Sequence, residues 1–116
     1  MADVGTTQVD RFTNTVEFTG NAMSSVDDWI QVHAHSSEFS FAANVTSSAN
    51  FTIALEANFN GNGDWFTIDT SKTINAAGQY VYFYTGKAAT LIRMRIASIS
   101  SGVVAMTPHV VVAYHG

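Results

Sequence analysis

Two histidines separated by one residue, His33 and His35, have the spacing that best suits a metal ion. Residues i and i+2 of a β-strand point to the same side about 7 Å apart, so the two imidazoles could bind one ion. The third ligand would have to be His109 or His115, and no acidic residue stands at a matching spacing. We therefore expect two polar histidines on a solvent or interface face and no metal site.

A second candidate for metal binding is the set of oxygen ligands Asn60, Asn62 and Asp64, which alternate as in a calcium-binding loop. Such a loop needs glycine at its sixth position and glutamate at its twelfth, where this chain has Trp65 and Ser71. The Asn-Gly pairs in this segment instead supply the backbone conformation of a hairpin turn. We predict a turn between two strands.

Acid–base catalysis would need two carboxylates that share a site, and Asp27 and Asp28 are adjacent. Adjacent residues of an extended chain point in opposite directions, so this pair suits a loop or a strand edge. The chain has no cysteine, no Gly-x-Ser-x-Gly motif and no glycine-rich phosphate-binding loop. We expect neither an enzyme nor a bound cofactor.

Alternating tyrosines and arginines are the side chains best suited to bind another molecule. Val81 and Phe83, which separate the tyrosines, are expected to face the core, which places the tyrosines on the outer surface. The arginines of the following strand are expected on the same outer face, where a guanidinium can stack on an aromatic ring. Such residues are enriched at protein interfaces, although a packing ladder within one subunit is the alternative. The candidate residues are Tyr80, Tyr82, Tyr84, Arg93 and Arg95.

The composition indicates that β-strands position these side chains. The 116 residues include 19 Val and Ile but only two Leu, and 14 residues are aromatic. Branched and aromatic side chains favour strands, and the alternation of apolar with polar residues gives about eight of them between Arg11 and His115. We predict an all-β, single-domain antiparallel β-sandwich of the jelly-roll or Ig-like type.

The ends of the chain are expected to differ from this regular pattern. Residues 1–9 are small and polar without a clear period, so we expect a short flexible N-terminal arm before a sandwich domain at residues 10–116. Near the other end, Pro108 is expected to separate two strands, residues 103–107 and 109–115, or to lie at an edge bulge.

Charged residues make up 12% of the chain, about half the usual share. Five Lys and Arg residues cannot form a basic patch, so nucleic acid is not an expected partner. The two long uncharged tracts, residues 39–55 and 96–116, are interrupted by polar turns, which argues against a membrane span. The last strands are apolar on both faces, and in a two-layer fold the second cover must come from another chain. We therefore expect a homo-oligomer or a component of a larger lattice.

Four stretches resemble small β-sandwich structural proteins of tailed bacteriophages. They are a strand (51–58), an Asn/Asp-Gly turn that ends in Trp (60–65), a Gly before an aromatic strand (78–80) and a strand with alternating Arg (91–96). The resemblance covers roughly residues 51–115 and is one of strands and turns rather than of a signature motif. Within that group, small single-domain members are similar to capsid decoration, or cement, proteins.

This resemblance implies a function in the virion, on the surface of the capsid, for a protein made in the host cytoplasm without a secretion signal. Decoration proteins sit on the expanded shell as trimers, sometimes dimers, and clamp neighbouring subunits of the major capsid protein. The arm, with Asp3, Val4, Thr6 and Thr7, would grip the shell, and the tyrosine and arginine faces would make oligomer or shell contacts.

The alternative is a tail or fibre domain, or a carbohydrate-binding β-sandwich. In that case Trp29, Tyr82 and Tyr84 would stack on sugar rings.

Overall fold

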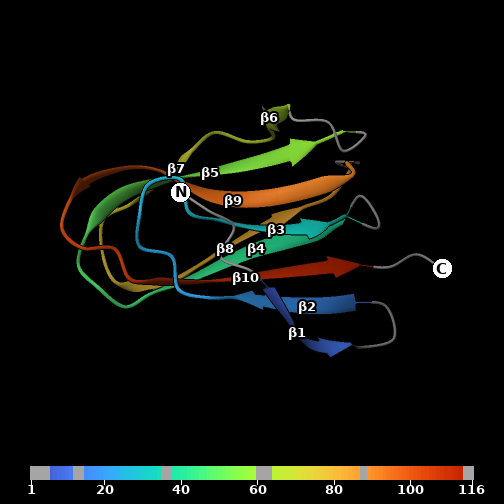
Figure 1. The fold of residues 1–116 in the computed structure, drawn as a ribbon, viewed down its shortest axis with the longest axis horizontal. Helices are drawn as coiled ribbons and strands as arrows, with labels where there is room; N and C mark the ends of the chain where they lie inside the picture. The colour runs from blue at the N-terminus through green and yellow to red at the C-terminus, as the bar shows by residue number, and fades with distance from the viewer. Residues whose placement is uncertain (1–5, 12–14, 35–37, 60–63, 87–88, 114–116) are drawn as a thin grey trace.

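The computed structural model describes residues 6–11, 15–34, 38–59, 64–86 and 89–113. Within them the strands are β1 (Thr6–Arg11), β2 (Thr15–Gly20), β3 (Trp29–His33), β4 (Phe39–Val45), β5 (Asn50–Asn58), β6 (Trp65–Thr67), β7 (Lys72–Ile74), β8 (Gly78–Tyr84), β9 (Leu91–Ser101) and β10 (Met106–Ala113). They form two antiparallel sheets, one over the other (Figure 1). The predicted all-β sandwich is confirmed.

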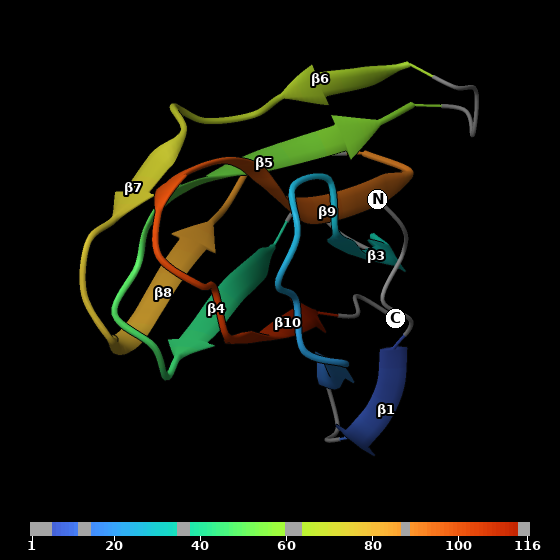
Figure 2. The same ribbon diagram turned by 60° about the vertical axis from the view of Figure 1, so that its left-hand side comes forward.

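The two sheets are named after a central strand of each. The β10 sheet has the strand order β1-β2-β10-β4-β8, and the β5 sheet has the order β3-β9-β5-β6. The short strands β6 and β7 both pair with β5, β6 with residues 56–58 and β7 with residues 51–53 (Figure 2). Together they therefore occupy the place of one edge strand.

The chain changes sheet at six of the nine steps between consecutive strands. From β2 to β5, and again from β8 to β10, each strand lies in the opposite sheet from the strand before it. With β1 as an added edge strand, this order is that of a double-sheet jelly roll, whereas an Ig-like fold keeps its fourth and fifth strands in one sheet and its last two strands in the other. Of the two predicted topologies, the chain adopts the jelly roll.

The core lies between the sheets and is built from alternate residues of each strand. β4 shows this pattern without exception, because every second residue from Phe39 to Val45 is buried. Each large side chain that is removed from water in this way stabilises the fold by about 1.5–3 kcal/mol. The largest fully buried side chains are Phe41, Phe51, Met23, Ile30, Ile53, Leu55, Ile74, Ile92, Met94, Ile96, Met106 and Val16.

Strand β1 begins inside the segment that was expected to be a flexible arm. It pairs with β2 from Thr6 opposite Gly20 to Arg11 opposite Val16, with an irregularity between Gln8 and Asp10. The predicted arm is therefore too long, since Thr6 and Thr7 belong to the sheet. The sequence gives little sign of β1, because backbone hydrogen bonds alone can add a strand that lacks apolar alternation. The other two arm residues named above, Asp3 and Val4, lie outside the described residues.

Strand β10 passes through Pro108 without a break, although two separate strands were predicted. Met106 exchanges backbone hydrogen bonds of 2.7 and 3.2 Å with Met23, so its N–H and C=O face the side on which β2 lies. By alternation Pro108 faces the same side, where the ladder with β2 begins only at His109. The N–H that proline lacks would have met no ladder partner there, so the ring is accommodated.

Candidate interaction surface

The outer face of the β10 sheet presents its side chains in rows that cross the strands. One row is Phe83, Ser40, Val111 and Glu17, on β8, β4, β10 and β2 in turn, and the next row is Val81, Ala42, His109 and Thr19. These positions alternate with the buried ones, so they point away from the core. Four strands therefore contribute to one continuous surface.

This surface exposes two large apolar side chains beside small ones. Phe83 is 79% exposed and Val81 is 49% exposed, both on the edge strand β8. Their neighbours on β4, Ser40 and Ala42, are short and border a shallow depression of about 420 Å³. The large side chains of β8 protrude beside the depression over β4, so the face is uneven in shape as well as apolar.

The same surface is almost without charge. Among the described outward residues of β2, β10, β4 and β8, Glu17 is the only Asp, Glu, Lys or Arg. His109 Nδ1 lies 3.0 Å from Thr19 Oγ1, which satisfies one polar ring atom within the face. A surface of this kind resembles the centre of a protein interface, where charged residues are depleted.

The tyrosines of β8 point inward, which is the reverse of the prediction. Tyr84 is buried, and Tyr80 and Tyr82 pack against the core. Each of two hydroxyls reaches an acceptor at the edge of the core: Tyr80 Oη donates to the Ala76 carbonyl and Tyr84 Oη to Asp69 Oδ2, both at 2.7 Å. A tyrosine can therefore bury its apolar ring and keep its hydroxyl satisfied, which leaves Val81 and Phe83 on the outer face.

Asp69 connects the segment between β6 and β7 to β8. Its carboxylate accepts a hydrogen bond from Tyr84 Oη, lies 3.0 Å from Lys72 Nζ and accepts a 2.7 Å hydrogen bond from the Thr70 amide. These contacts, led by the tyrosine hydrogen bond, lower the pKa of Asp69 to about 2. Burial, with the hydrogen bond to Asp69, raises the pKa of Tyr84.

The lowered pKa of Asp69 predicts a defined acid sensitivity. The ionised carboxylate stabilises the fold fully above its ordinary pKa of 3.8, and this contribution disappears as the pH falls through about 2. We expect the difference in free energy of unfolding between wild type and Asp69→Asn to shrink over that interval, measured by urea denaturation. In Tyr84→Phe, the pKa of Asp69 followed by NMR should rise towards 3.8. An unchanged pKa in that variant would contradict the assigned cause.

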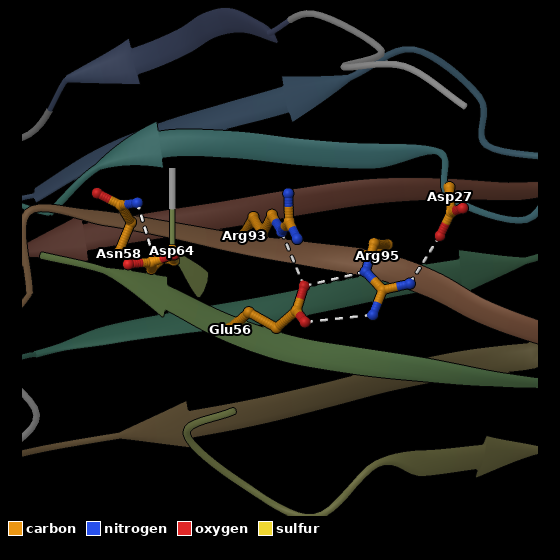
Figure 3. A network of polar contacts seen from close by, with 6 residues as sticks. All are labelled: Asp27, Glu56, Asn58, Asp64, Arg93 and Arg95. Carbon is orange, nitrogen blue, oxygen red and sulfur yellow. Dashed lines mark hydrogen bonds and ion pairs between the residues drawn. The ribbon is translucent and has the colours of Figure 1, made fainter. Parts of the chain in front are cut away.

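The arginines lie on the outer face of the β5 sheet, away from the tyrosines. Arg93 and Arg95 on β9 both contact Glu56 on β5, as Figure 3 shows. Arg93 Nε donates to Glu56 Oε1 at 2.7 Å, and Arg95 donates from Nε to Oε1 at 3.0 Å and from Nη2 to Oε2 at 3.2 Å. The predicted stacking of these arginines on the tyrosines is therefore wrong, because the two sets belong to different sheets.

Arg93 contacts two indole rings instead. Its guanidinium carbon lies 4.0 Å from the centre of the Trp65 ring and 5.4 Å from that of Trp29. These distances fit cation–π contacts, which stabilise by about 0.5–2 kcal/mol each. Trp29 on β3, Arg93 on β9 and Trp65 on β6 thus cover the outer side of the β5 sheet, and we call them the Trp–Arg–Trp cluster.

Glu56 lies beneath this cluster and is only 7% exposed. Burial alone would raise its pKa, but the hydrogen bonds from Arg95 and Arg93 outweigh that effect, so the pKa of Glu56 is lowered. The same hydrogen bond raises the pKa of Arg95. Glu56, Arg93 and Arg95 therefore form a charged network in which both oxygens of the buried carboxylate accept hydrogen bonds.

The two adjacent carboxylates have separate structural contacts, as their spacing predicted. Asp27, with a positive φ of 68°, holds Arg95 Nη1 at 2.7 Å through its Oδ1. Asp28 Oδ2 accepts hydrogen bonds from the amides of Ser24 and Ser25 at 3.0 and 2.9 Å. Asp27 therefore extends the arginine network, and Asp28 closes a turn.

The metal candidates of the sequence lie only partly within the described residues. His33 ends β3, while His35, Asn60, Asn62 and His115 fall outside. The carbonyl of Asp64 accepts a 2.9 Å hydrogen bond from Asn58 Nδ2 (Figure 3), which fits the predicted turn between β5 and β6. In the part of the chain that the structure describes, no three His, Cys, Asp or Glu residues are grouped to hold a metal ion, and no helix is long and apolar enough to cross a membrane.

Sequence reasoning missed three residues that define these surfaces. Phe83 was assigned to the core, and neither Glu56 nor Trp65 was singled out. A signal for Glu56 was present, because it is the only charged residue of β5 and the arginines are the only charged residues of β9. A lone acid and two bases in apolar strands favour pairing of those strands.

Comparison with known proteins gives little beyond the chain itself. No protein-family model matches it, and no curated protein matches it. One solved structure, described as "CBM4 structure and function", is similar with a TM-score of 0.38 and 14% identity, over 95% of this chain and 79% of that one. The jelly-roll assignment follows from the strand order of this chain.

Proposed function

We propose that this protein is a structural component of a viral shell, a capsid decoration protein that acts by adding protein–protein contacts. The outer face of the β10 sheet is the contact surface. The resemblance of four stretches to phage structural proteins supports the viral setting, and the character of this face supports the mode of action.

The exposure of Phe83 on a surface with few charges is the observation that carries the proposal. A phenylalanine that is 79% exposed gains about 1.5–3 kcal/mol when a partner covers it. Burial of Val81, which lies beside Phe83, adds to this gain. Because the face carries few charges, little free energy is lost by removing water from charged groups. The face therefore favours burial against protein.

The mechanism is additive. A ligand that binds the assembled shell, and not its separated subunits, stabilises the shell by mass action. Each bound copy contributes a small free energy, and a repeating lattice multiplies that contribution by the number of occupied sites. The major capsid protein would be the partner.

Rebinding to shells tests this function. Wild-type protein added to virus heads that lack it should bind them and raise their rupture temperature. Phe83→Asp should bind at least about tenfold more weakly, because an aspartate would be buried in place of an apolar ring. Val103→Asp is the matched control, since Val103 is 78% exposed but lies outside the β10 sheet. Heads that do not bind the wild-type protein would refute the decoration function.

A second candidate function is carbohydrate binding by the Trp–Arg–Trp cluster. The observation in its favour is that two indoles and an arginine share one outer face, where indole rings can stack on sugars. The tyrosines predicted for this function do not take part, because Tyr84 is buried and Tyr82 lies on the inner side of the other sheet. Retention on a polysaccharide column that is lost in Trp65→Ala, with no binding to virus heads, would favour this candidate.

A further inference from the structure

We propose that the Trp–Arg–Trp cluster binds an uncharged oligosaccharide, and that the two terminal nitrogens of Arg93 donate hydrogen bonds to its hydroxyl groups. This inference rests on the second candidate function, carbohydrate binding, and it names the class of ligand. The cluster lies on the outer side of the β5 sheet, whereas the face given to the shell lies on the outer side of the other sheet. A copy bound to a shell through the β10 sheet therefore leaves the cluster uncovered.

Arg93 keeps hydrogen-bond donors that its neighbour Arg95 does not. Arg95 donates from Nε and Nη2 to Glu56 and from Nη1 to Asp27, so all three of its nitrogens are occupied. Arg93 donates only from Nε, to Glu56, and its two terminal nitrogens have no acceptor among the described residues (Figure 3). Its side chain is 14% exposed and its guanidinium is held against Trp65, so these donors have a fixed position and can reach a ligand.

Two uncharged polar side chains continue the line of Arg93 across the sheet. Gln31 on β3 lies opposite Arg93, and Thr67 on β6 lies opposite Glu56. Amide and hydroxyl groups both donate and accept hydrogen bonds, as the hydroxyl groups of a sugar do. From Gln31 to Thr67 the row spans three strand spacings, or about 14 Å, so it suits an oligosaccharide better than a single sugar.

The two indoles lie on either side of this row and supply apolar surface. Trp29 is in the row of Arg95, and Trp65 is in the row of Asn58. Both rings contact the Arg93 guanidinium, at 5.4 and 4.0 Å, so one short ligand can touch both. Trp29 Nε1 is buried, so this indole presents its apolar ring rather than its N–H. A sugar has an apolar C–H face and a rim of hydroxyl groups, which matches indoles beside hydrogen-bonding groups.

The charges around the cluster select an uncharged ligand. The charged residues among the described outward positions of β3, β9, β5 and β6 are Arg93, Arg95 and Glu56. Asp27 and Asp64 lie in the segments just before β3 and β6, so two cations stand beside three carboxylates. The whole chain carries a net charge of −4. A carboxylated or sulfated sugar would therefore be repelled, whereas hydroxyl groups meet no such repulsion.

An array of uncharged, carboxylated and sulfated oligosaccharides tests the class of ligand. We expect wild-type protein to bind only uncharged ones, and the binding to stay constant when NaCl is raised from about 0.05 M to about 0.5 M, because no ion pair forms. Binding that favours acidic oligosaccharides, or that does not distinguish the classes, would overturn the inference and keep carbohydrate binding. Absence of binding to every oligosaccharide would refute both.

Two lysine variants test the part assigned to Arg93. Arg93→Lys keeps the positive charge beside Glu56 but loses the fork of donors, so the dissociation constant should rise about tenfold. Arg95→Lys is the matched control, because Arg95 lies on the same strand, shares Glu56 and has no nitrogen left for a ligand. It should lose stability in urea denaturation, as Arg93→Lys does, yet bind within about twofold of wild type. Equal weakening of binding in the two variants would contradict the assignment.

The two sheets are separated by exchanging the assays. Arg93→Lys should bind virus heads as the wild-type protein does, and Phe83→Asp should bind the uncharged oligosaccharide as the wild-type protein does. Loss of oligosaccharide binding in Phe83→Asp would place the ligand on the β10 sheet and overturn the inference.

Discussion

Replacement of Glu56 by glutamine should lower the free energy of unfolding by about 2–4 kcal/mol. Glu56 accepts hydrogen bonds from both Arg93 and Arg95, and the side chains of those arginines are only 14% and 23% exposed. A neutral amide would leave two guanidinium groups close together without a counter-charge. Its NH₂ group would also point a donor at donors, which leaves buried polar groups unsatisfied. The partial exposure of the arginines keeps the expected loss below that of a fully buried pair.

Urea denaturation at neutral pH measures this loss, and Glu17→Gln provides the control. Glu17 carries the same change on the outer face of the other sheet, so its effect should stay within about 0.5 kcal/mol. The cost of Glu56→Gln should also fall as the pH drops, because the lowered pKa of Glu56 means that its stabilisation is present above 4.5 and is lost in acid. Equal effects of the two glutamine variants would show that the arginine network contributes no stability.

The alternation of apolar and polar residues predicted the long strands that build most of the core and missed two strands at sheet edges, β1 and β7. In β4 the apolar residues recur at every second position, and their burial follows that order. In β5 the apolar residues also recur at every second position, but the residues between them from Ala54 to Asn58 are buried as well. β1 and β7 carry no such pattern. β1 pairs with β2, and the three residues of β7 pair with β5 at its edge. Such strands depend on backbone groups left unpaired by a neighbour, which local sequence does not display.

The direction of β8 was unpredictable for a different reason. Both of its faces are apolar enough for a core, since tyrosines alternate with Val81 and Phe83. Asp69, which lies 15 residues earlier, accepts a hydrogen bond from the hydroxyl of Tyr84 and so stabilises the inward direction of the tyrosines. A contact of that separation appears only when the fold brings the segment between β6 and β7 next to β8. The position of the candidate interaction surface followed from the direction of β8.

The arginines show which features the alternation of apolar and polar residues can predict and which it cannot. Their position opposite Ile92 and Met94 was predicted, and burial confirms it. Their partner was not, because Arg93 and Glu56 are 37 residues apart and meet only through the pairing of β5 with β9. Strand order therefore had to be known before the Trp–Arg–Trp cluster could be found.

Among Gly78, Gly86 and Gly102, the three described glycines with a positive φ, Gly102 should be the least tolerant of alanine, with a loss of about 3 kcal/mol in the free energy of unfolding. Its φ of +81° is disfavoured for alanine, which costs about 1–2 kcal/mol. A Cβ at this position would also lie 2.9 Å from the Ser48 carbonyl oxygen and 3.0 Å from Ala49 Cα. Both are backbone atoms, so the segment between β4 and β5 would have to move.

That segment cannot move without breaking other contacts, which is why the expected loss is large. Ser47 Oγ donates to the Val103 carbonyl at 2.6 Å and accepts from the Ala105 amide at 3.0 Å. Gly86→Ala is the matched control, because Gly86 has a φ of +71° but no atom within 4 Å of the added Cβ. It should lose only the backbone term of about 1–2 kcal/mol, measured by the same urea denaturation. If the two variants lose equal stability, the close approach of residues 48 and 49 to Gly102 does not contribute to the loss. Faster amide exchange at Ala105 in Gly102→Ala, but not in Gly86→Ala, would show that the structural change lies at this end of the sandwich.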